Sequence, residues 1–281
     1  MLKVQKQDGF AHTILILAML VILVISFAGY RVATNSKNNK DSNTQNTQLN
    51  ATKDSWEYDG SAWNPTGNPP KCSTPLLNRS PVDIKTVTAI LYPGQVRGQY
   101  KAHGGFHFRN NATNDVRVVM PIDGKITSAV RYYQTGDNGV NELQYLVTFL
   151  NDCGVSIKFD HLLTLSPEVQ SIMDRQPAAK LNDTGSLPLK GGELFKEGAV
   201  IATAVGQKSN VSVGMDFGVY DYRKKNAASK DSAYAEAHKT ASYADFYATC
   251  WLNDLPVTDS VIAKSLPGGD GKMGTTSDYC K

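Results

Sequence analysis

Two histidines and an aspartate are the residues of this chain whose types and spacing could bind a catalytic metal. His103 and His107 lie in the segment His-Gly-Gly-Phe-His, and Asp216 lies much later in Gly-Met-Asp-Phe. Two imidazoles and one carboxylate form a zinc ligand set that leaves a fourth position for water or substrate. We therefore predict one metal site at His103, His107 and Asp216, with zinc as the ion.

The spacing of the two histidines places a demand on the backbone. Four residues of straight strand span roughly 13 Å, which is a long distance for two side chains that share one ion. Gly104 and Gly105 lie between the histidines and would allow the segment to bend. The alternative interpretation is chance, because any two of the five histidines in the chain can fall close together without a function.

The composition indicates a folded domain in an oxidising compartment. A chain of 281 residues with 41% hydrophobic content can bury a sizeable core. The 29 basic and 26 acidic residues are scattered, so no basic stripe predicts a nucleic-acid partner. Cys72, Cys153, Cys250 and Cys280 are an even set, which predicts up to two disulfides in one of three pairings.

The N-terminal segment has the composition of a membrane anchor. No charged residue occurs between Asp8 and Arg31. At about 1.5 Å per residue, a helix over 10–30 would cross a bilayer core of roughly 30 Å. We predict one transmembrane anchor over 1–31 rather than a cleaved signal peptide, because the apolar run is long and no small-residue cleavage site follows it. The Asn-, Ser-, Thr- and Gln-rich residues 32–55 predict a flexible linker.

The middle of the chain has the pattern of a mainly β domain. Short runs of β-branched and aromatic residues alternate with turn residues and predict strands at 86–91, 116–120, 125–131, 143–150, 155–159, 199–205 and 211–220. Helices are predicted at 166–175, with Ser166 as N-cap, and at 233–250. We expect an antiparallel sheet.

Domain boundaries follow from these patterns. We assign 1–31 to the anchor, 32–55 to the linker, 56–222 to the β domain and 223–281 to a C-terminal appendage, which a Cys250–Cys280 disulfide would close. The pair Tyr132 and Tyr133 could line a ligand groove, although strand aromatics more commonly belong to a core.

Several short motifs in the same order resemble a known family. The segment from His103 to Phe108 is similar to H-x-G-x-D-F, and 214–219 is similar to H-x-H-F-E-V. Between them, 118–126, 154–162 and 195–206 match the proline-glycine, His-Leu and glycine-turn segments of the same family. In this order the motifs resemble the lysostaphin-type, or LytM-type, zinc endopeptidases that cut peptidoglycan peptides.

This resemblance implies an antiparallel β-sheet or half-barrel and a zinc ion. The family's three ligand positions carry His103, His107 and Asp216, so one imidazole and the carboxylate have exchanged places. His161 matches a histidine that does not bind the ion, and we predict that it activates water or stabilises the oxyanion. Gly214 replaces a second histidine of this kind, and the loss of one acid-base group typically costs 10² to 10⁴-fold in rate.

Three functional interpretations remain open. The first is a membrane-anchored peptidoglycan endopeptidase with its domain on the extracytoplasmic side. The second is an inactive relative that binds cell-wall peptide or a partner hydrolase, which Gly214 favours. The third is a pilin-like surface subunit, because residues 3–10 resemble a type IV prepilin leader. Ile14 stands where that leader requires glutamate, and cleavage after Gly9 would support this third interpretation.

Overall fold

The computed structural model describes residues 55–109, 113–136, 138–185, 188–189, 191–208, 213–239, 244–269 and 276–281. These residues belong to one compact unit, Lys53–Lys281. The predicted transmembrane helix and nearly all of the predicted linker lie outside the described residues. Within the described ranges, no helix is both long and apolar enough to cross a membrane.

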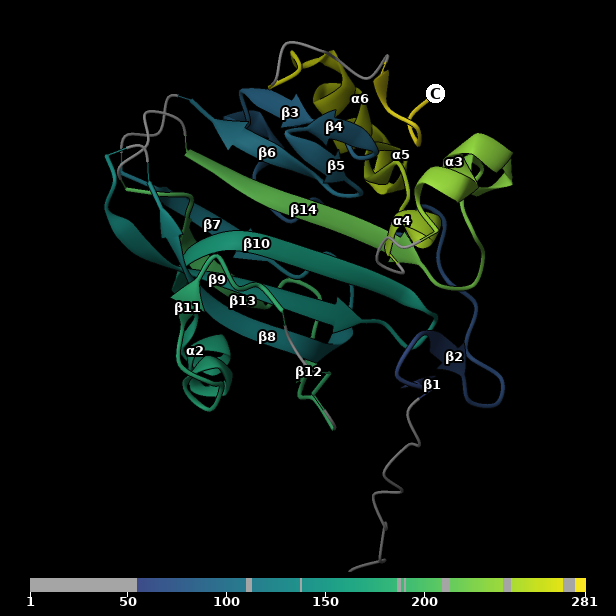
Figure 1. Cartoon of the computed structure of the whole chain (residues 1–281), viewed down its shortest axis with the longest axis horizontal. Coiled ribbons are helices and arrows are strands. Elements are labelled where there is room, and N and C mark those ends of the chain that lie inside the picture. The colour runs from purple at the N-terminus through teal and green to yellow at the C-terminus, as the bar shows by residue number, and fades with distance from the viewer. Residues whose placement is uncertain are drawn as a thin grey trace, which may run out of the picture. The chain divides into compact units, whose positions relative to one another are not determined.

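A large sheet runs through this unit (Figure 1). Its main path follows the order β11 (Lys180–Leu181), β8 (Gly124–Thr135), β9 (Asn141–Leu150), β10 (Val155–Leu165), β14 (Val213–Asp221), β6 (Gly104–Phe108) and β3 (Ala89–Leu91). Off this path, β12 (Leu194–Phe195) pairs with β8, and β13 (Val200–Val205) pairs with β10 and with β7 (Asp115–Val119). Among the described strands of this sheet, β11 pairs with β8 in parallel and the other pairs are antiparallel. The prediction of a mainly antiparallel β fold is therefore confirmed.

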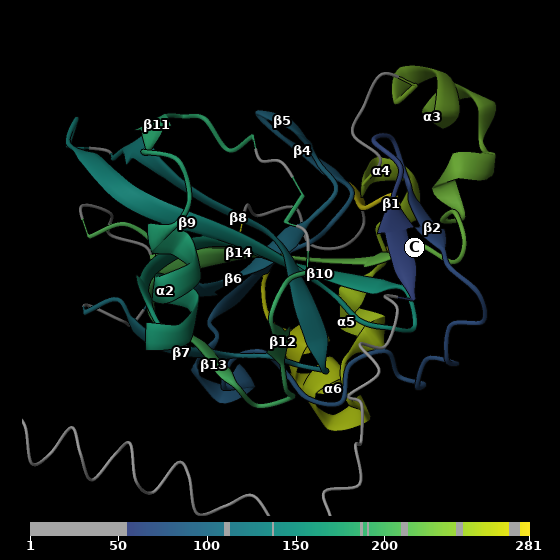
Figure 2. The same cartoon turned by 90° about the horizontal axis from the view of Figure 1, so that it is seen from below.

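Two hairpins and several short helices complete the described structure. The hairpins are β1 (Trp56–Tyr58) with β2 (Trp63–Pro65), and β4 (Gln95–Arg97) with β5 (Gln99–Lys101). The helices are η1 (Ile84–Thr86), α2 (Pro167–Asp174), η2 (Ala228–Lys230), α3 (Ser232–Ala237), α4 (Ala244–Tyr247), α5 (Trp251–Asp254) and α6 (Val257–Ser265). In Figures 1 and 2, α2 lies far from α5 and α6, towards the opposite end of the sheet.

The two faces of the central strands differ in polarity. Phe159 of β10 and Phe217 of β14 are fully buried in the core, and their rings lie 5.5 Å apart. Because side chains alternate along a strand, the residues between the core positions point to the other face. That face carries Lys158, Asp160 and Asp216, which are polar groups that could take part in binding or catalysis.

The predicted elements agree well with the observed ones in the β domain. Each predicted strand range overlaps an observed strand, whereas β1, β2, β4, β5, β6, β11 and β12 lie outside the predicted ranges. The helix predicted at 166–175 is confirmed as α2, in which the Ser166 hydroxyl accepts from the Val169 N–H. The continuous helix predicted at 233–250 is wrong, because α3 ends at Ala237. His238 stacks on the Tyr234 ring and hydrogen-bonds to Asp245 through Nδ1 at 2.9 Å, and these contacts replace a further helical turn.

Two disulfides are present, which is the largest number that the sequence predicted. Cys72 is bonded to Cys153, and Cys250 to Cys280. The C-terminal segment also contributes Trp251 to the same core as the strands, where its ring centroid lies 4.7 Å from that of Phe106. The tail is thus tied to the β domain by packing, and the Cys250–Cys280 disulfide closes a loop within the tail itself.

Candidate functional site

The predicted site residues lie on three neighbouring strands. His161 is on β10, Asp216 on β14 and His107 on β6, and His103 directly precedes β6. β14 runs between β10 and β6, so Asp216 lies at the centre of the group. Figure 1 shows these strands side by side.

Asp216 contacts two imidazoles through one oxygen. Its Oδ2 lies 2.9 Å from Nε2 of His103 and 3.6 Å from Nε2 of His161. The three side chains are partly accessible, with 12% of His103, 18% of Asp216 and 26% of His161 exposed. The structure thus brings together two of the predicted metal ligands, His103 and Asp216, and adds His161 to them.

His107 lies on β6, four residues after His103. It pairs with Gly214 across β6 and β14, whereas Asp216 pairs with Gly105. A Cβ atom at Gly214 would lie 3.2 Å from the His107 ring, so the imidazole packs into the space that a side chain there would use. Its role as the third metal ligand stays a prediction.

The two glycines between the histidines are required by close strand contact. A Cβ atom at Gly105 would lie 2.5 Å from the Met215 carbonyl oxygen, and one at Gly104 would lie 2.1 Å from the Leu91 carbonyl oxygen. Neither glycine has a left-handed φ, so backbone freedom is not the reason for them. Gly105 makes room for Asp216, whose Oδ1 would be 3.3 Å from the added Cβ.

Asp160 belongs to the site, although the sequence did not single it out. In a regular strand, Asp160 and His161 would point to opposite faces. A register shift between Phe159 and Leu162, with a left-handed φ of 61° at His161, forms a bulge that lets both side chains reach Asp216. No pattern of residue types marks such a bulge.

A buried tyrosine supports this bulge from β8. The Tyr132 hydroxyl donates to Asp160 Oδ1 at 2.7 Å and lies 3.3 Å from Nδ1 of His161. Burial and the charge of Asp160 raise the pKa of Tyr132, so the phenol keeps its proton. Lys158 lies on the other side of the carboxylate, with Nζ 3.4 Å from Asp160 Oδ2.

The donors at this site fit a divalent cation. Asp160 and Asp216 are directly opposite each other on β10 and β14, and like charges in such a pair are destabilising unless cations offset them. Lys158 lies beside Asp160, whereas Asp216 faces the two imidazoles. Ligand atoms of Asp160, His161 and Asp216 all lie within 4.8 Å of one another, and His103 contacts the same Asp216 oxygen. Imidazole nitrogen with carboxylate oxygen is a donor set that suits zinc.

Protonation of the metal-free site follows from burial and charge. Burial alone would lower the pKa of His161, but its hydrogen bond to Asp216 and the charges of Asp160 and Asp216 raise it to about 9. Burial lowers the pKa of His103, against the effect of Asp216. Burial would raise the pKa of Asp216, but the two histidines hold it well below its ordinary range. At neutral pH, His161 is therefore protonated and Asp216 ionised.

We expect the metal-free protein to lose stability as the pH rises from 7 to 9. The pKa of His161 is higher in the folded state than its ordinary 6.5, so its contribution is present below pH 6.5 and is lost as the pH passes about 9. The expected loss is on the order of 1 to 3 kcal/mol. Urea unfolding with a chelator at both pH values measures it, and a His161→Gln variant should lack this slope. Equal slopes in the two proteins would contradict the assignment.

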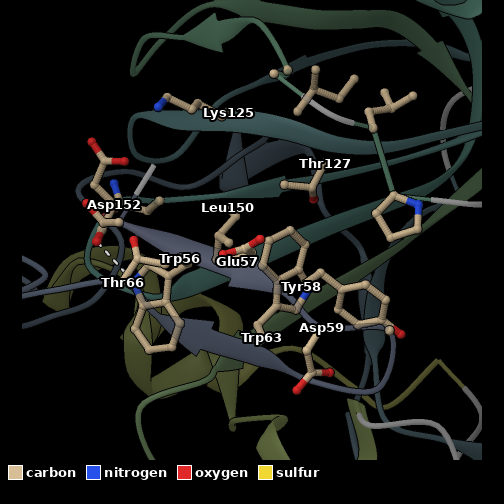
Figure 3. A pocket seen from close by; sticks show the side chains of 18 residues that line it. Trp56, Glu57, Tyr58, Asp59, Trp63, Thr66, Lys125, Thr127, Leu150 and Asp152 are labelled. Carbon is tan, nitrogen blue, oxygen red and sulfur yellow. Dashed lines mark hydrogen bonds between the residues drawn. The ribbon is translucent and has the colours of Figure 1, made fainter. Parts of the chain in front are cut away.

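A separate cleft lies on another part of the domain. Its volume is about 950 Å³, and it lies between the β1–β2 hairpin and β8. Figure 3 shows Trp56, Tyr58 and Trp63 on the hairpin side and Lys125 and Thr127 on the β8 side. The histidine–aspartate cluster does not line this cleft, so the two features are distinct.

Comparisons with known proteins give only partial similarity. No protein-family model and no curated protein matches the chain. A zinc-containing peptidase from Vibrio cholerae is 17% identical, with a TM-score of 0.31, over 51% of this chain and 36% of the peptidase. The solution structure of lysostaphin is 13% identical, with a TM-score of 0.31, over 51% of this chain and 47% of lysostaphin. The chain thus spans less than half the length of either protein it is similar to.

Proposed function

We propose that the chain is a metal-dependent hydrolase, and specifically a zinc endopeptidase that cuts peptidoglycan peptides. One observation carries the proposal: a single oxygen of Asp216 lies between the Nε2 atoms of His103 and His161 on a solvent-accessible face. A structural ion pair would need only one histidine. The nearer imidazole and the carboxylate can supply ligands for a cation, and the second imidazole is left for proton transfer.

His103 and Asp216 would hold the ion, and His107 is the third ligand in this proposal. Zinc, when bound, polarises a scissile carbonyl and lowers the pKa of a bound water toward ~7. His161 is assigned to proton transfer rather than to binding, because its Nε2 is the more distant of the two nitrogens near Asp216. In its neutral form, His161 would take a proton at Nε2 from the attacking water and return it to the leaving amine.

Lys158 contributes positive charge to the same face. Its Nζ lies 3.4 Å from Asp160 Oδ2, and its side chain is 20% exposed. An ammonium there offsets the second carboxylate and favours a substrate that develops negative charge on oxygen. The lost imidazole at Gly214 is not replaced by this amine, so we expect a slow enzyme.

The substrate and location are supported by the sequence. The ordered motifs resemble peptidoglycan endopeptidases, which also favours a half-barrel form of the sheet. The apolar segment 10–30 supports a membrane anchor, and the two disulfides suit an extracytoplasmic domain. Cell-wall peptide is the proposed substrate on these grounds.

Digestion of isolated peptidoglycan by the purified protein tests this function. We expect release of free amino groups that stops with a chelator and returns with zinc. His161→Gln should lower the rate by about 10² to 10⁴-fold while zinc stays bound. A zinc-loaded protein that releases no amines would contradict the hydrolase proposal.

The second candidate is a binding module without catalysis, and Gly214 is the observation that favours it. Co-sedimentation with peptidoglycan separates the two functions. Retention on peptidoglycan without release of amines is the result expected of the binding module.

A further inference from the structure

The contacts of Tyr132 determine which nitrogen of His161 faces the site. The phenol has one proton, and it donates this proton to Asp160 Oδ1 at 2.7 Å. The same phenol oxygen lies 3.3 Å from Nδ1 of His161. Since the proton of the phenol is already used, its oxygen can only accept from that nitrogen. Nδ1 therefore carries a hydrogen, and Nε2 is the atom on the Asp216 side.

Asp160 is engaged on both oxygens by groups of the protein itself. Oδ1 accepts from the Tyr132 hydroxyl and from the backbone N–H of His161 at 2.9 Å. Oδ2 lies 3.4 Å from the Lys158 ammonium. A carboxylate with this many donors is held in place, and it holds the phenol and the His161 backbone in turn.

The backbone at His161 needs such support. Its φ of 61° is in the left-handed region, which is costly for a residue other than glycine. The Gly206 N–H donates to the His161 carbonyl oxygen at 2.7 Å, and Asp160 accepts the N–H on the other side. Both polar groups of the strained peptide are thus satisfied, and only the imidazole remains to be oriented.

We infer that Tyr132 and Asp160 are positioning residues that fix the ring orientation of His161 and hold the hydrogen on its Nδ1. Tyr132 holds Nδ1 through its oxygen, and Asp160 holds both Tyr132 and the bulge. Nε2 is then kept towards Asp216, where it is available for proton transfer. The catalytic consequence rests on the proposed function, whereas the orientation of the ring does not.

A Tyr132→Phe variant tests this inference, because it removes one hydroxyl and keeps the buried ring. Asp160 retains its contacts with the His161 N–H and Lys158, so the carboxylate is not left without partners. In zinc-free protein with ¹⁵N-labelled histidine, the wild type should show a slowly exchanging Nδ1–H signal, assigned by its absence in His161→Gln. Tyr132→Phe should lose it, and peptide release should fall by roughly 10 to 100-fold.

The neighbouring Tyr133→Phe is the matched control, because Tyr133 is 40% exposed and lies on the opposite face of β8. It should leave the signal and the rate unchanged. Asp160→Asn keeps an oxygen acceptor and should retain the signal, whereas Asp160→Ala should lose it. An Nδ1–H signal that persists in Tyr132→Phe would overturn the inference.

The two proposals fail in different ways. If peptidoglycan is not cut but the Nδ1–H signal is lost in Tyr132→Phe, the positioning inference is supported and the endopeptidase function is contradicted. If peptidoglycan is cut and the Nδ1–H signal persists in Tyr132→Phe, only the positioning inference is contradicted. Should Tyr132→Phe unfold, the comparison of Asp160→Asn with Asp160→Ala gives the same decision.

Discussion

Replacement of Asp216 by alanine is expected to abolish zinc binding and leave the fold intact. The carboxylate is the one group in contact with both His103 and His161, so no other described side chain can take its place. It faces away from the core, and its removal creates no apolar cavity. Isothermal titration with zinc measures the loss, and circular dichroism verifies the fold.

Asp174→Ala is the control for this experiment, because Asp174 is an exposed carboxylate on α2. It should bind zinc as the wild type does. Unchanged zinc affinity in Asp216→Ala would contradict the proposed site. It would leave the contact between His103 and Asp216 as a structural ion pair.

Trp251→Ala should cost about 3–5 kcal/mol of unfolding free energy. The indole is fully buried, and its ring centroid lies 4.7 Å from that of Phe106 and 5.3 Å from that of Phe217. Its Nε1–H has no hydrogen-bond partner among the described residues, so its contribution is packing. Urea unfolding at constant pH measures the change.

Trp63→Ala provides the comparison, because Trp63 is half-buried in the β1–β2 hairpin and stacks on Tyr222. The loss of unfolding free energy in Trp63→Ala should be clearly smaller than in Trp251→Ala. A loss below about 1 kcal/mol in Trp251→Ala would mean that the C-terminal segment is an independent appendage. The larger loss would establish that α5 belongs to the core that positions β6 and β14.

The longer strands could be predicted because their residue pattern is local, whereas β6, which carries His107, was not predicted. Runs of β-branched and aromatic residues separated by turns predicted the positions of β7 to β10, β13 and β14. The start of α2 could be predicted from Ser166 and Pro167. The Ser166 side chain accepts from a backbone N–H of the first turn, and proline is favoured at the first helical position. The meeting of His103 with Asp216 was predicted from the order of the motifs, and it follows physically from the pairing of β6 with β14.

The rest of the site depends on contacts that no local pattern encodes. A bulge changes which face a side chain occupies, so the approach of Asp160 and His161 to Asp216 required the three-dimensional register. Tyr132 was considered as a groove or core residue, and its hydrogen bond to Asp160 comes from the pairing of distant strands. The end of α3 depends on the contacts of His238 with Tyr234 and Asp245, and the helix propensities of single residues do not include such contacts.

The metal content of the purified full chain tests the central claim most directly. Elemental mass spectrometry after exposure to zinc and removal of free ions should find about one zinc per chain in the wild type. His103→Ala and His107→Ala should lose it, and His161→Gln should keep it. No bound divalent metal in the wild type would contradict the site, and with it the hydrolase.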